Sequence, residues 1–297
     1  MNTDTSTTRP GATLQAIQRH YDVGNEFYRL WLDDSLSYSG AMWEPGDSLE
    51  SAQLRKVDYH IAAAHAANAE RVLDVGCGWG SVLRRLVDQA SVRQAVGLTL
   101  SQAQADWIAS QQSPHIEVRV ENWLDHVPAQ PYDAIISIGA FEHFARVEDS
   151  DQKRIEGYRE FFRSCRSWLR RGGRMSLQTF AYGNLRSREE AHRSAGTRFL
   201  ASEIFPETDP PRLSDIAVAI DGEFEIELLR NDRKDYARTC MTWLKRLRAA
   251  RSQAVDLVGA EVVSRYERYL QLSTLGFETG NLLLLRITLR RIDQARG

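Results

Sequence analysis

The sequence has few cysteines, no long apolar run and no excess of charge, and each lack excludes a class of protein. Its three cysteines, Cys77, Cys165 and Cys240, are scattered without metal-ligand spacing and fit a reducing cytosol better than a disulfide scaffold. No apolar run approaches the roughly 18 residues of a membrane helix, and Leu282–Leu285 is a buried strand at most. With 38 Lys and Arg against 40 Asp and Glu, the net charge of −2 gives no general attraction to nucleic acid.

What is present is ordinary for a globular protein. Of the 297 residues, 42% are hydrophobic and 26% are charged. Residues Met1–Gly11 are rich in Thr and Ser without an apolar core, so we expect a flexible tail rather than a signal peptide or an anchor. The composition predicts a soluble, cytoplasmic protein with no nucleic-acid partner and no integral membrane association. The oligomeric state, including a homo-oligomer, stays open.

Hydrophobic periodicity divides the chain into two parts. Helices over Thr13–Leu32 and Leu49–Ala67 predict an N-terminal helical cap at residues 12–67. Beyond it, in residues 68–297, strands alternate with helices. Strands are expected at Arg71–Val75, Gln94–Leu98, Ile116–Val120, Tyr132–Ile138 and Arg174–Thr179, and helices at Ser81–Gln89, Ser101–Ser110 and Arg154–Leu169. This alternation indicates parallel βαβ crossovers and therefore an α/β, doubly wound sheet.

The regular pattern stops after the fifth strand. Residues 180–216 show no sustained period, and a segment of this length is typical of a lid or binding insertion. Two late strands, Phe224–Arg230 and Leu282–Leu289, then flank a helical region at Ala237–Leu270. The expected sheet is thus mostly parallel and seven-stranded.

A glycine-rich turn follows the first strand. Asp74 stands near the end of that strand, and Gly76, Gly78 and Gly80 open the next helix. Glycines allow a sharp turn and a close approach of a ligand to the backbone. A dinucleotide site is disfavoured, because the third glycine comes one residue early and Asp74 would repel the pyrophosphate. A ligand with an ammonium and a sulfonium but no phosphate, S-adenosylmethionine, fits better. A tight turn without a ligand is the alternative.

The ends of the next two strands supply further candidate contacts. The second strand carries no carboxylate for ribose hydroxyls, so Thr99 and Gln104 must provide those hydrogen bonds. Asn122 and Trp123 follow the third strand, where an adenine would lie, and the indole could cover its face. Ordinary packing is the other interpretation of Trp123.

Several spaced motifs occur together in a fixed order. They are His20–Asp22, Leu36–Ser39, Val75–Gly80, Gly97–Ser101, Ser137–Phe144, Glu203–Pro206, and Tyr236–Thr239 with Trp243. In these motifs the chain, from about Ile17 onward, resembles the cyclopropane-fatty-acyl-phospholipid and mycolic-acid cyclopropane synthase family. The resemblance implies a class I, Rossmann-like methyltransferase domain that uses S-adenosylmethionine. It also implies cofactor contacts at Tyr38, Ser39, Gly76, Gly78, Thr99, Leu100, Gln104, Trp123 and Ile138.

The resemblance also implies a chemistry. Methyl transfer to an alkene leaves a carbocation, and in the family a bicarbonate held by Cys, Glu, His and Tyr is thought to remove the proton. Glu142 and Tyr236 match two of these positions, whereas Gly40 replaces the Cys and Gln178 replaces the His. We therefore expect activity without added bicarbonate, with Glu142 acting as the base or as an electrostatic stabiliser. The alternatives are a structural Glu142 bonded to an arginine or a backbone amide, and a Tyr236 phenol packed in the core.

Four arginines lie within the expected lid, at Arg186, Arg188, Arg193 and Arg198. Arginine matches phosphate geometry, which favours a small alkene substrate with an anionic head, such as a prenyl diphosphate, over a lipid. Glu189, Glu190 and Glu203 would neutralise these arginines in the alternative interpretation.

The sequence therefore predicts a C-methyltransferase acting on an alkene carbon of an apolar substrate, prenyl diphosphate-like or lipid. A cyclopropane synthase of unsaturated fatty acyl chains, an N-methyltransferase of a small amine and a non-catalytic cofactor-binding module remain as alternatives. No metal site is expected.

Overall fold

The computed structural model describes residues 10–13, 15, 23–185 and 187–294. The helix expected over Thr13–Leu32 lies partly outside this set, and the described part of it contains α2 (Asn25–Arg29). Most of the tail at residues 1–11 lies outside as well. The second helix of the N-terminal part, α3, spans Leu49–Ala63 and is capped by Ser48, whose hydroxyl accepts a hydrogen bond from the backbone N–H of Ser51.

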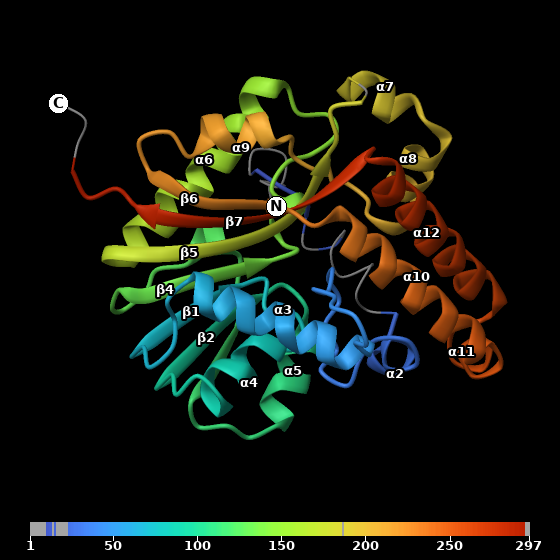
Figure 1. Cartoon of the computed structure of the whole chain (residues 1–297), viewed down its shortest axis with the longest axis horizontal. Helices are drawn as coiled ribbons and strands as arrows, with labels where there is room; N and C mark the ends of the chain where they lie inside the picture. The colour runs from blue at the N-terminus through green and yellow to red at the C-terminus, as the bar shows by residue number, and fades with distance from the viewer. Residues whose placement is uncertain (1–9, 14, 16–22, 186, 295–297) are drawn as a thin grey trace, which may run out of the picture.

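Within the described residues, seven strands form one sheet in the order β3-β2-β1-β4-β5-β7-β6 (Figure 1). Their bounds are β1 (Arg71–Val75), β2 (Gln94–Thr99), β3 (Ile116–Val120), β4 (Tyr132–Ile138), β5 (Leu169–Tyr182), β6 (Phe224–Asn231) and β7 (Leu282–Arg291). The first five strands pair in parallel, and β7 runs antiparallel between β5 and β6. The expected doubly wound, mostly parallel seven-stranded sheet is confirmed.

Side chains of the central strands contribute to two separate hydrophobic cores, one on each face of the sheet. Leu73 and Ile135 pack with α6 (Asp151–Trp168) and α9 (Leu213–Ala219). Their neighbours Val72 and Ala134 pack with α3, α4 (Ser81–Asp88) and α5 (Gln102–Ser110). Because successive side chains of a strand point to opposite faces, this apolar pattern lets helices cover both faces of the sheet (Figure 1).

A third core lies beyond the end of the sheet. The helical region between β6 and β7 forms α10 (Arg233–Ala249), α11 (Arg251–Val258) and α12 (Ala260–Thr279). Gly259, with a φ of +85°, makes the break between α11 and α12 without the strain that a side chain would add. Aromatic residues of α2, including Phe27 and Tyr28, pack with these helices.

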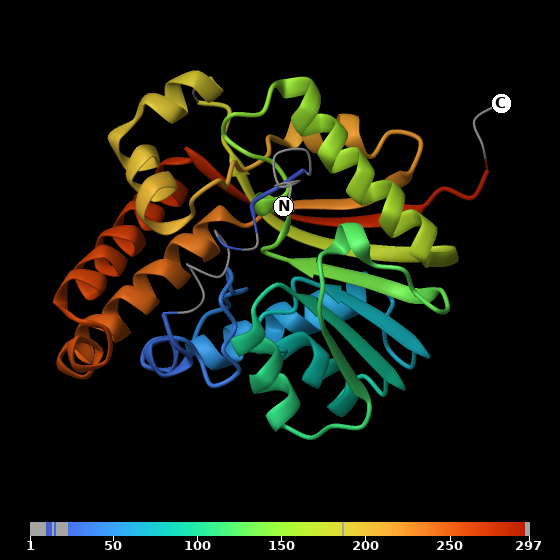
Figure 2. The same ribbon diagram turned by 180° about the vertical axis from the view of Figure 1, so that it is seen from behind.

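Residues 180–216 hold more regular structure than the sequence pattern indicates. They contain α7 (Arg188–Arg193), α8 (Ala195–Phe199), the π-helical turn η4 (Leu200–Ile204) and the start of α9. Helices of five to seven residues are too short to display a hydrophobic period. Figure 2 shows α8 beside α12, with α7 following the far end of β5. None of the helices in the described part of the chain combines the length and apolar character needed to cross a bilayer.

Candidate active site

A first cavity lies at the carboxyl ends of β1, β2 and β4, which is where doubly wound sheets bind ligands. All eleven residues that the sequence suggested for cofactor binding contribute to its wall. They are Tyr38, Ser39, Asp74, Gly76, Gly78, Thr99, Leu100, Gln104, Asn122, Trp123 and Ile138. The structure thus brings the whole expected set together, although its members come from five separate stretches of the chain.

The glycine turn shapes one wall of this cavity. A Cβ atom at Gly76 would stand 2.4 Å from the Cβ of Ala140, so no larger residue fits there without movement. At Gly78, whose φ is +53°, a Cβ atom would meet no atom of the described residues within 4 Å. The backbone at Gly78 therefore faces open space, and a ligand can approach it closely.

Two buried side chains of opposite charge line the same cavity. Burial raises the pKa of Asp74 to about 7, against the opposing attraction of Lys56. The ammonium of Lys56, on α3, donates a hydrogen bond of 3.0 Å to Ser39 Oγ, and burial lowers its pKa to about 8. Our sequence analysis missed Lys56. Its signal was a charged residue within the apolar stripe of α3 that includes Ala52 and Val57.

The expected ribose and adenine contacts have partners of their own. The hydroxyl of Thr99 donates to Gln104 Oε1 at 2.7 Å. Asn122 accepts a hydrogen bond of 3.0 Å from the N–H of Leu124 and so begins the short helix η2 (Trp123–Asp125). The indole of Trp123 both lines the cavity and packs edge-on against Phe161, with ring centres 5.2 Å apart. Trp123 is therefore a packing residue that also faces the cavity, and its contact with an adenine stays a prediction.

A second cavity of about 410 Å³ lies between the segment 180–216 and helices α10 and α12. Its lining is largely apolar and includes Phe180, Leu200, Phe205, Tyr236, Cys240, Tyr269, Leu272, Phe277 and Leu282. The ring of Tyr236 stacks on Phe277 with ring centres 4.4 Å apart. The hydroxyl of Tyr38, a residue of the first cavity, donates to Tyr269 Oη at 3.2 Å. The two cavities therefore share a wall.

Glu142 lies in that region, in the short helix η3 (Phe141–His143) that follows β4. Ala140, two residues before Glu142, lines the first cavity. Glu142 Oε1 accepts a hydrogen bond of 2.7 Å from the N–H of Phe180, which lines the second cavity. Its Oε2 is buried with no hydrogen-bond partner among the described residues. Burial raises the pKa of Glu142 to about 7, against the opposing effects of its own backbone N–H, the Phe180 amide and the nearby Thr179 hydroxyl. One oxygen thus has the structural role considered above. The other is buried beside the cavity walls, and Glu142 itself is not among the residues that line either cavity.

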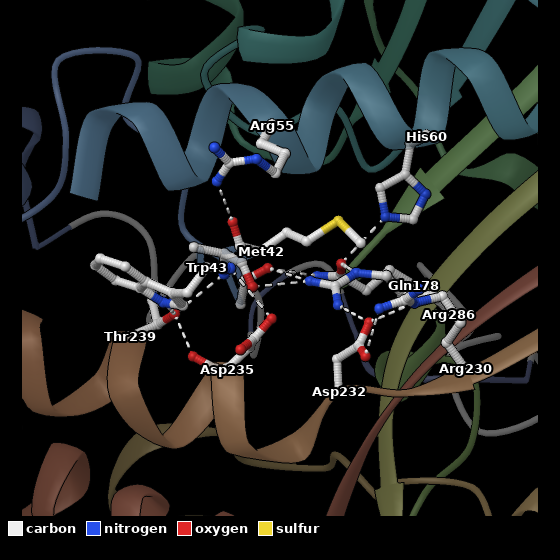
Figure 3. Close-up of polar contacts among 12 residues, drawn as sticks. Met42, Trp43, Arg55, His60, Gln178, Arg230, Asp232, Asp235, Thr239 and Arg286 are labelled. Carbon is white, nitrogen blue, oxygen red and sulfur yellow. Dashed lines mark hydrogen bonds and ion pairs between the residues drawn. The ribbon is translucent and has the colours of Figure 1, made fainter. Parts of the chain in front are cut away.

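Gln178 belongs to a buried hydrogen-bond network, drawn in Figure 3, and not to the lining of either cavity. Its Oε1 accepts from Arg286 Nε at 2.8 Å and from His60 Nε2 at 3.1 Å. His60 Nε2 therefore carries the proton, and Nδ1 accepts from the hydroxyl of Ser176 at 2.7 Å. Gln178 stands where the resemblance places a bicarbonate-holding His, which made it a candidate catalytic residue. In the structure its amide oxygen is used by Arg286 and His60, and Gln178 lines neither cavity.

Arg286 is the centre of the network and has no exposed surface. It forms an ion pair with Asp232 and donates to the carbonyl oxygens of Gly40 and Ala41 at 3.1 and 2.9 Å (Figure 3). Arg286 thereby fixes the segment that carries Tyr38 and Ser39 to the sheet. Sequence analysis overlooked Arg286, although a charge between the apolar residues Leu285 and Ile287 of β7 was a visible signal.

The arginines of segment 180–216 do not form the expected anion site. Arg186 lies outside the described residues. Arg188 is buried between Asp209 and Asp215, with both contacts at 2.5 Å, so its guanidinium is already neutralised. The alternative partners were also wrong for Arg188, because Glu189, Glu190 and Glu203 are not the acids it pairs with.

The other two arginines are exposed. Arg193 Nε donates to the carbonyl oxygen of Glu189 at 3.2 Å. Arg198 lines the second cavity and donates to the carbonyl oxygen of Arg193 at 2.6 Å. In the described part of the chain, no group of three or more His, Cys, Asp or Glu is arranged to hold a metal ion.

Comparisons with known proteins agree with this geometry. A profile of the family described as mycolic acid cyclopropane synthetase matches residues 8–287. Cyclopropane mycolic acid synthase 2 of Mycobacterium bovis is 33% identical, covering 90% of this chain and 91% of that protein. Hydroxymycolate synthase MmaA4 of Mycobacterium tuberculosis is 32% identical, covering 90% and 89%. The crystal structure of mycolic acid cyclopropane synthase CmaA1 complexed with SAH and CTAB superposes with a TM-score of 0.85 at 29% identity, covering 95% of this chain and 99% of that one.

Proposed function

The chain belongs to the mycolic acid cyclopropane synthetase family of S-adenosylmethionine-dependent methyltransferases, and on that premise we propose that it methylates an alkene carbon of a long-chain unsaturated lipid. The observation that carries the proposal is Glu142. It is a buried carboxylate between the linings of two cavities, with one oxygen that has no partner among the described residues.

The first cavity would hold S-adenosylmethionine, which supplies an electrophilic methyl group on a sulfonium. The residues fit this ligand in two respects. Gly78 leaves open space against the backbone, and the buried Asp74 carboxylate favours a cation over a phosphate. Thr99, Gln104 and Trp123 would contact the ribose and the adenine.

The second cavity would hold the acceptor. Its apolar lining suits an acyl chain, and the names of the relatives refer to mycolic acids, which supports a lipid. A prenyl diphosphate is less favoured than the sequence indicated, because Arg188 is neutralised by Asp209 and Asp215. Segment 180–216 would be the lid, since α7, α8 and η4 contribute to this cavity.

The protein's part in the reaction follows from this arrangement. Holding the alkene in line with the methyl–sulfur bond supplies much of the rate enhancement. The alkene electron pair would form the new carbon–carbon bond while the methyl–sulfur bond breaks and its electron pair goes to the sulfur, which would leave a carbocation on the acceptor. Ionised Glu142 would stabilise this charge and then take a proton, either from a carbon next to the cation or from the transferred methyl group. The electrons of the broken C–H bond form either a new double bond or a cyclopropane ring. Tyr236, beside the cation, would orient the chain.

Glu142 would act without bicarbonate. Gly40 brings no ligand, and Gln178 Oε1 is already used by Arg286 and His60. Activity in carbonate-depleted buffer should therefore equal activity after bicarbonate is added. Strong stimulation by bicarbonate would show instead that Glu142 and Tyr236 hold the ion.

The test uses S-adenosylmethionine whose methyl group carries deuterium at all its positions, with mass spectrometry of the products. Acceptors are a phospholipid with unsaturated acyl chains, geranyl diphosphate and a small secondary amine. Methylation of the lipid supports the proposal; full deuterium retention would indicate a methyl branch, and loss of one deuterium a cyclopropane. Methylation of the amine or the diphosphate alone, or cofactor binding without any transfer, would refute it.

A further inference from the structure

Lys56 is a buried ammonium that contacts no counter-charge in the part of the chain that the structure describes. Only 1% of the residue is exposed, and its hydrogen bond is to a neutral hydroxyl, Ser39 Oγ, at 3.0 Å. Among the described residues, no carboxylate lies within ion-pair distance of it, although Asp33 and Asp74 act on it from further away. Buried ammonium groups are costly unless they are paired, and this one has further N–H donors to satisfy.

The position of Lys56 in the wall of the first cavity suggests that a ligand in this cavity supplies its counter-charge. Lys56 and Ser39 both line the first cavity, and so does Asp74, another buried charge with no contacting counter-ion among the described residues. Since Lys56 donates to Ser39 Oγ, the hydroxyl proton of Ser39 remains available to a ligand. The cavity thus offers two donors at one place and a carboxylate at another. An α-amino acid zwitterion has the complementary pair of charges.

We propose that Lys56, through its ammonium and the Ser39 hydroxyl that it orients, binds the α-carboxylate of the cofactor's methionyl group, while Asp74 faces the α-ammonium. This inference rests on the proposed function, because it takes S-adenosylmethionine to be the ligand of the first cavity. It gives Lys56 a binding role, and it explains why a lysine occupies the apolar side of α3.

Ligands that lack the carboxylate, or both charged groups, test whether Lys56 binds the carboxylate. We would measure the affinity of three compounds by calorimetry: S-adenosylhomocysteine, its decarboxylated form S-adenosyl-3-thiopropylamine, and 5′-methylthioadenosine, which lacks both charged groups. Lys56→Gln should weaken S-adenosylhomocysteine by about 10- to 100-fold, the effect of one charge-assisted hydrogen bond. It should leave the thiopropylamine and methylthioadenosine within about threefold of their original affinities, since neither has a carboxylate.

Matched variants distinguish carboxylate binding by Lys56 from a general effect of the substitution on the cavity. Asp74→Asn should weaken both amino-containing ligands and spare methylthioadenosine. Lys245→Gln removes the same charge from an exposed position on α10 and should change no affinity. Equal weakening of all three ligands by Lys56→Gln would overturn the inference. If wild-type protein binds none of them, the proposed function itself is wrong, and the inference falls with it.

A measurement on the wild-type protein covers the case in which Lys56→Gln does not fold. The affinity gap between S-adenosylhomocysteine and its decarboxylated form should be large at neutral pH and should narrow as pH rises above about 8, where free Lys56 loses its proton. The charged and titratable groups near Lys56 are Asp33, Asp74, His60 and Arg286. A gap that stays constant up to pH 10 would contradict a role for Lys56.

Discussion

Gly40 lies directly against the ring of Tyr236: a Cβ atom at Gly40 would stand 2.8 Å from Tyr236 Cγ and 2.7 Å from Leu284 Cδ2. Real Cβ atoms do not approach other atoms so closely, so either the ring or the segment would have to shift. The position where the resemblance places a cysteine is therefore filled by the aromatic ring. Where the resemblance places a cysteine that holds bicarbonate, this chain has a glycine packed against Tyr236 and Leu284.

The first prediction concerns that contact. Gly40→Cys should lower the free energy of unfolding by about 1–3 kcal/mol, the usual cost of inserting atoms into a packed core. It should not create a requirement for bicarbonate, because Tyr236 and Leu284 occupy the space. Denaturant unfolding measures the stability change. Gly196→Ala is the matched control, since its added Cβ would meet Leu272 at an ordinary 3.5 Å. Equal stability of Gly40→Cys and wild type would contradict the packing described.

The second prediction concerns the open side of the glycine turn. Gly78→Val should abolish binding of S-adenosylhomocysteine in calorimetry, because the new side chain would enter the first cavity. The φ of +53° adds a conformational cost of about 1–2 kcal/mol. Gly172→Val has the same kind of cost, with a φ of +71° and open surroundings, but lies far from the cavity in sequence and on the surface. Gly172→Val should bind S-adenosylhomocysteine with the affinity of the wild type. Unchanged affinity in Gly78→Val would refute the cofactor site.

The third prediction concerns Glu142. Glu142→Gln should keep cofactor affinity and lose about 10²- to 10⁴-fold in turnover, the usual range for a positioned acid–base group. A base must be ionised, and burial raises the pKa of Glu142 to about 7, so the wild-type rate should rise as pH increases through about 7. Glu160→Gln, an exposed change on α6, serves as the control. Near-normal turnover in Glu142→Gln on the accepted substrate would remove Glu142 from the mechanism.

The fourth prediction concerns the partner of Arg286. Asp232→Asn should cost about 3–5 kcal/mol of stability, because it leaves a buried guanidinium without its counter-charge. Asp256→Asn, on the exposed side of α11, should cost almost nothing. If both variants unfold at the same denaturant concentration, the ion pair contributes no stability.

The same pair predicts acid sensitivity. Burial tends to raise the pKa of Asp232, but hydrogen bonds from Arg230 and Arg286 outweigh burial and lower it from the usual 3.8. A lowered carboxyl pKa contributes stability that is present above the unfolded value and is lost as pH falls through the folded value. The difference in stability between wild type and Asp232→Asn should therefore shrink below about pH 4.

The fifth prediction concerns Arg188. Arg188→Gln should lower the free energy of unfolding by about 3 kcal/mol, because Asp209 and Asp215 lose a buried partner. Arg198→Gln, on the exposed surface, should stay within about 0.5 kcal/mol of wild type. Urea titrations of the two variants decide the point. If Arg188→Gln instead keeps full stability and raises only the KM for a prenyl diphosphate, the anion site expected from the sequence is restored.

The sequence was most informative where local pattern decides structure. The bounds of β1, β3 and β4 were predicted as they are found, because short apolar strands between polar turns have few alternatives. Part of the first cavity was identified in the same way, because Asp74, the glycine turn, Thr99 and Gln104 follow strand ends that meet at one edge of a doubly wound sheet. Tyr38, Ser39, Leu100 and Ile138 came only from the family resemblance, and Lys56 was missed. The strand β5 was expected at Arg174–Thr179 but begins at Leu169, since its first part is polar and exposed.

Long-range polar contacts could not be predicted in the same way. His60 and Gln178 are separated by 118 positions, and Arg286 and Gly40 by 246. Nothing in the sequence around Gln178 reveals that its amide oxygen already has two donors. The partners of Arg188 could not be predicted either. Asp209 and Asp215 lie 21 and 27 positions after it, beyond the short helices α8 and η4. Local pattern identifies a charged residue but not the residue that neutralises it.

The position of β7 has a consequence for synthesis of the chain. This strand enters the sheet between β5 and β6, both of which are made before it, and it carries the arginine that holds the Gly40–Ala41 backbone. On the ribosome, β6 and the edge of β5 that faces away from β4 must therefore stay unpaired until β7 emerges, and Arg286 cannot hold the Gly40–Ala41 backbone before then. Such non-local pairing slows folding and exposes strand edges to wrong partners. A nascent chain of this protein should need shielding, and it should acquire its capacity for cofactor only after β7 has left the exit tunnel.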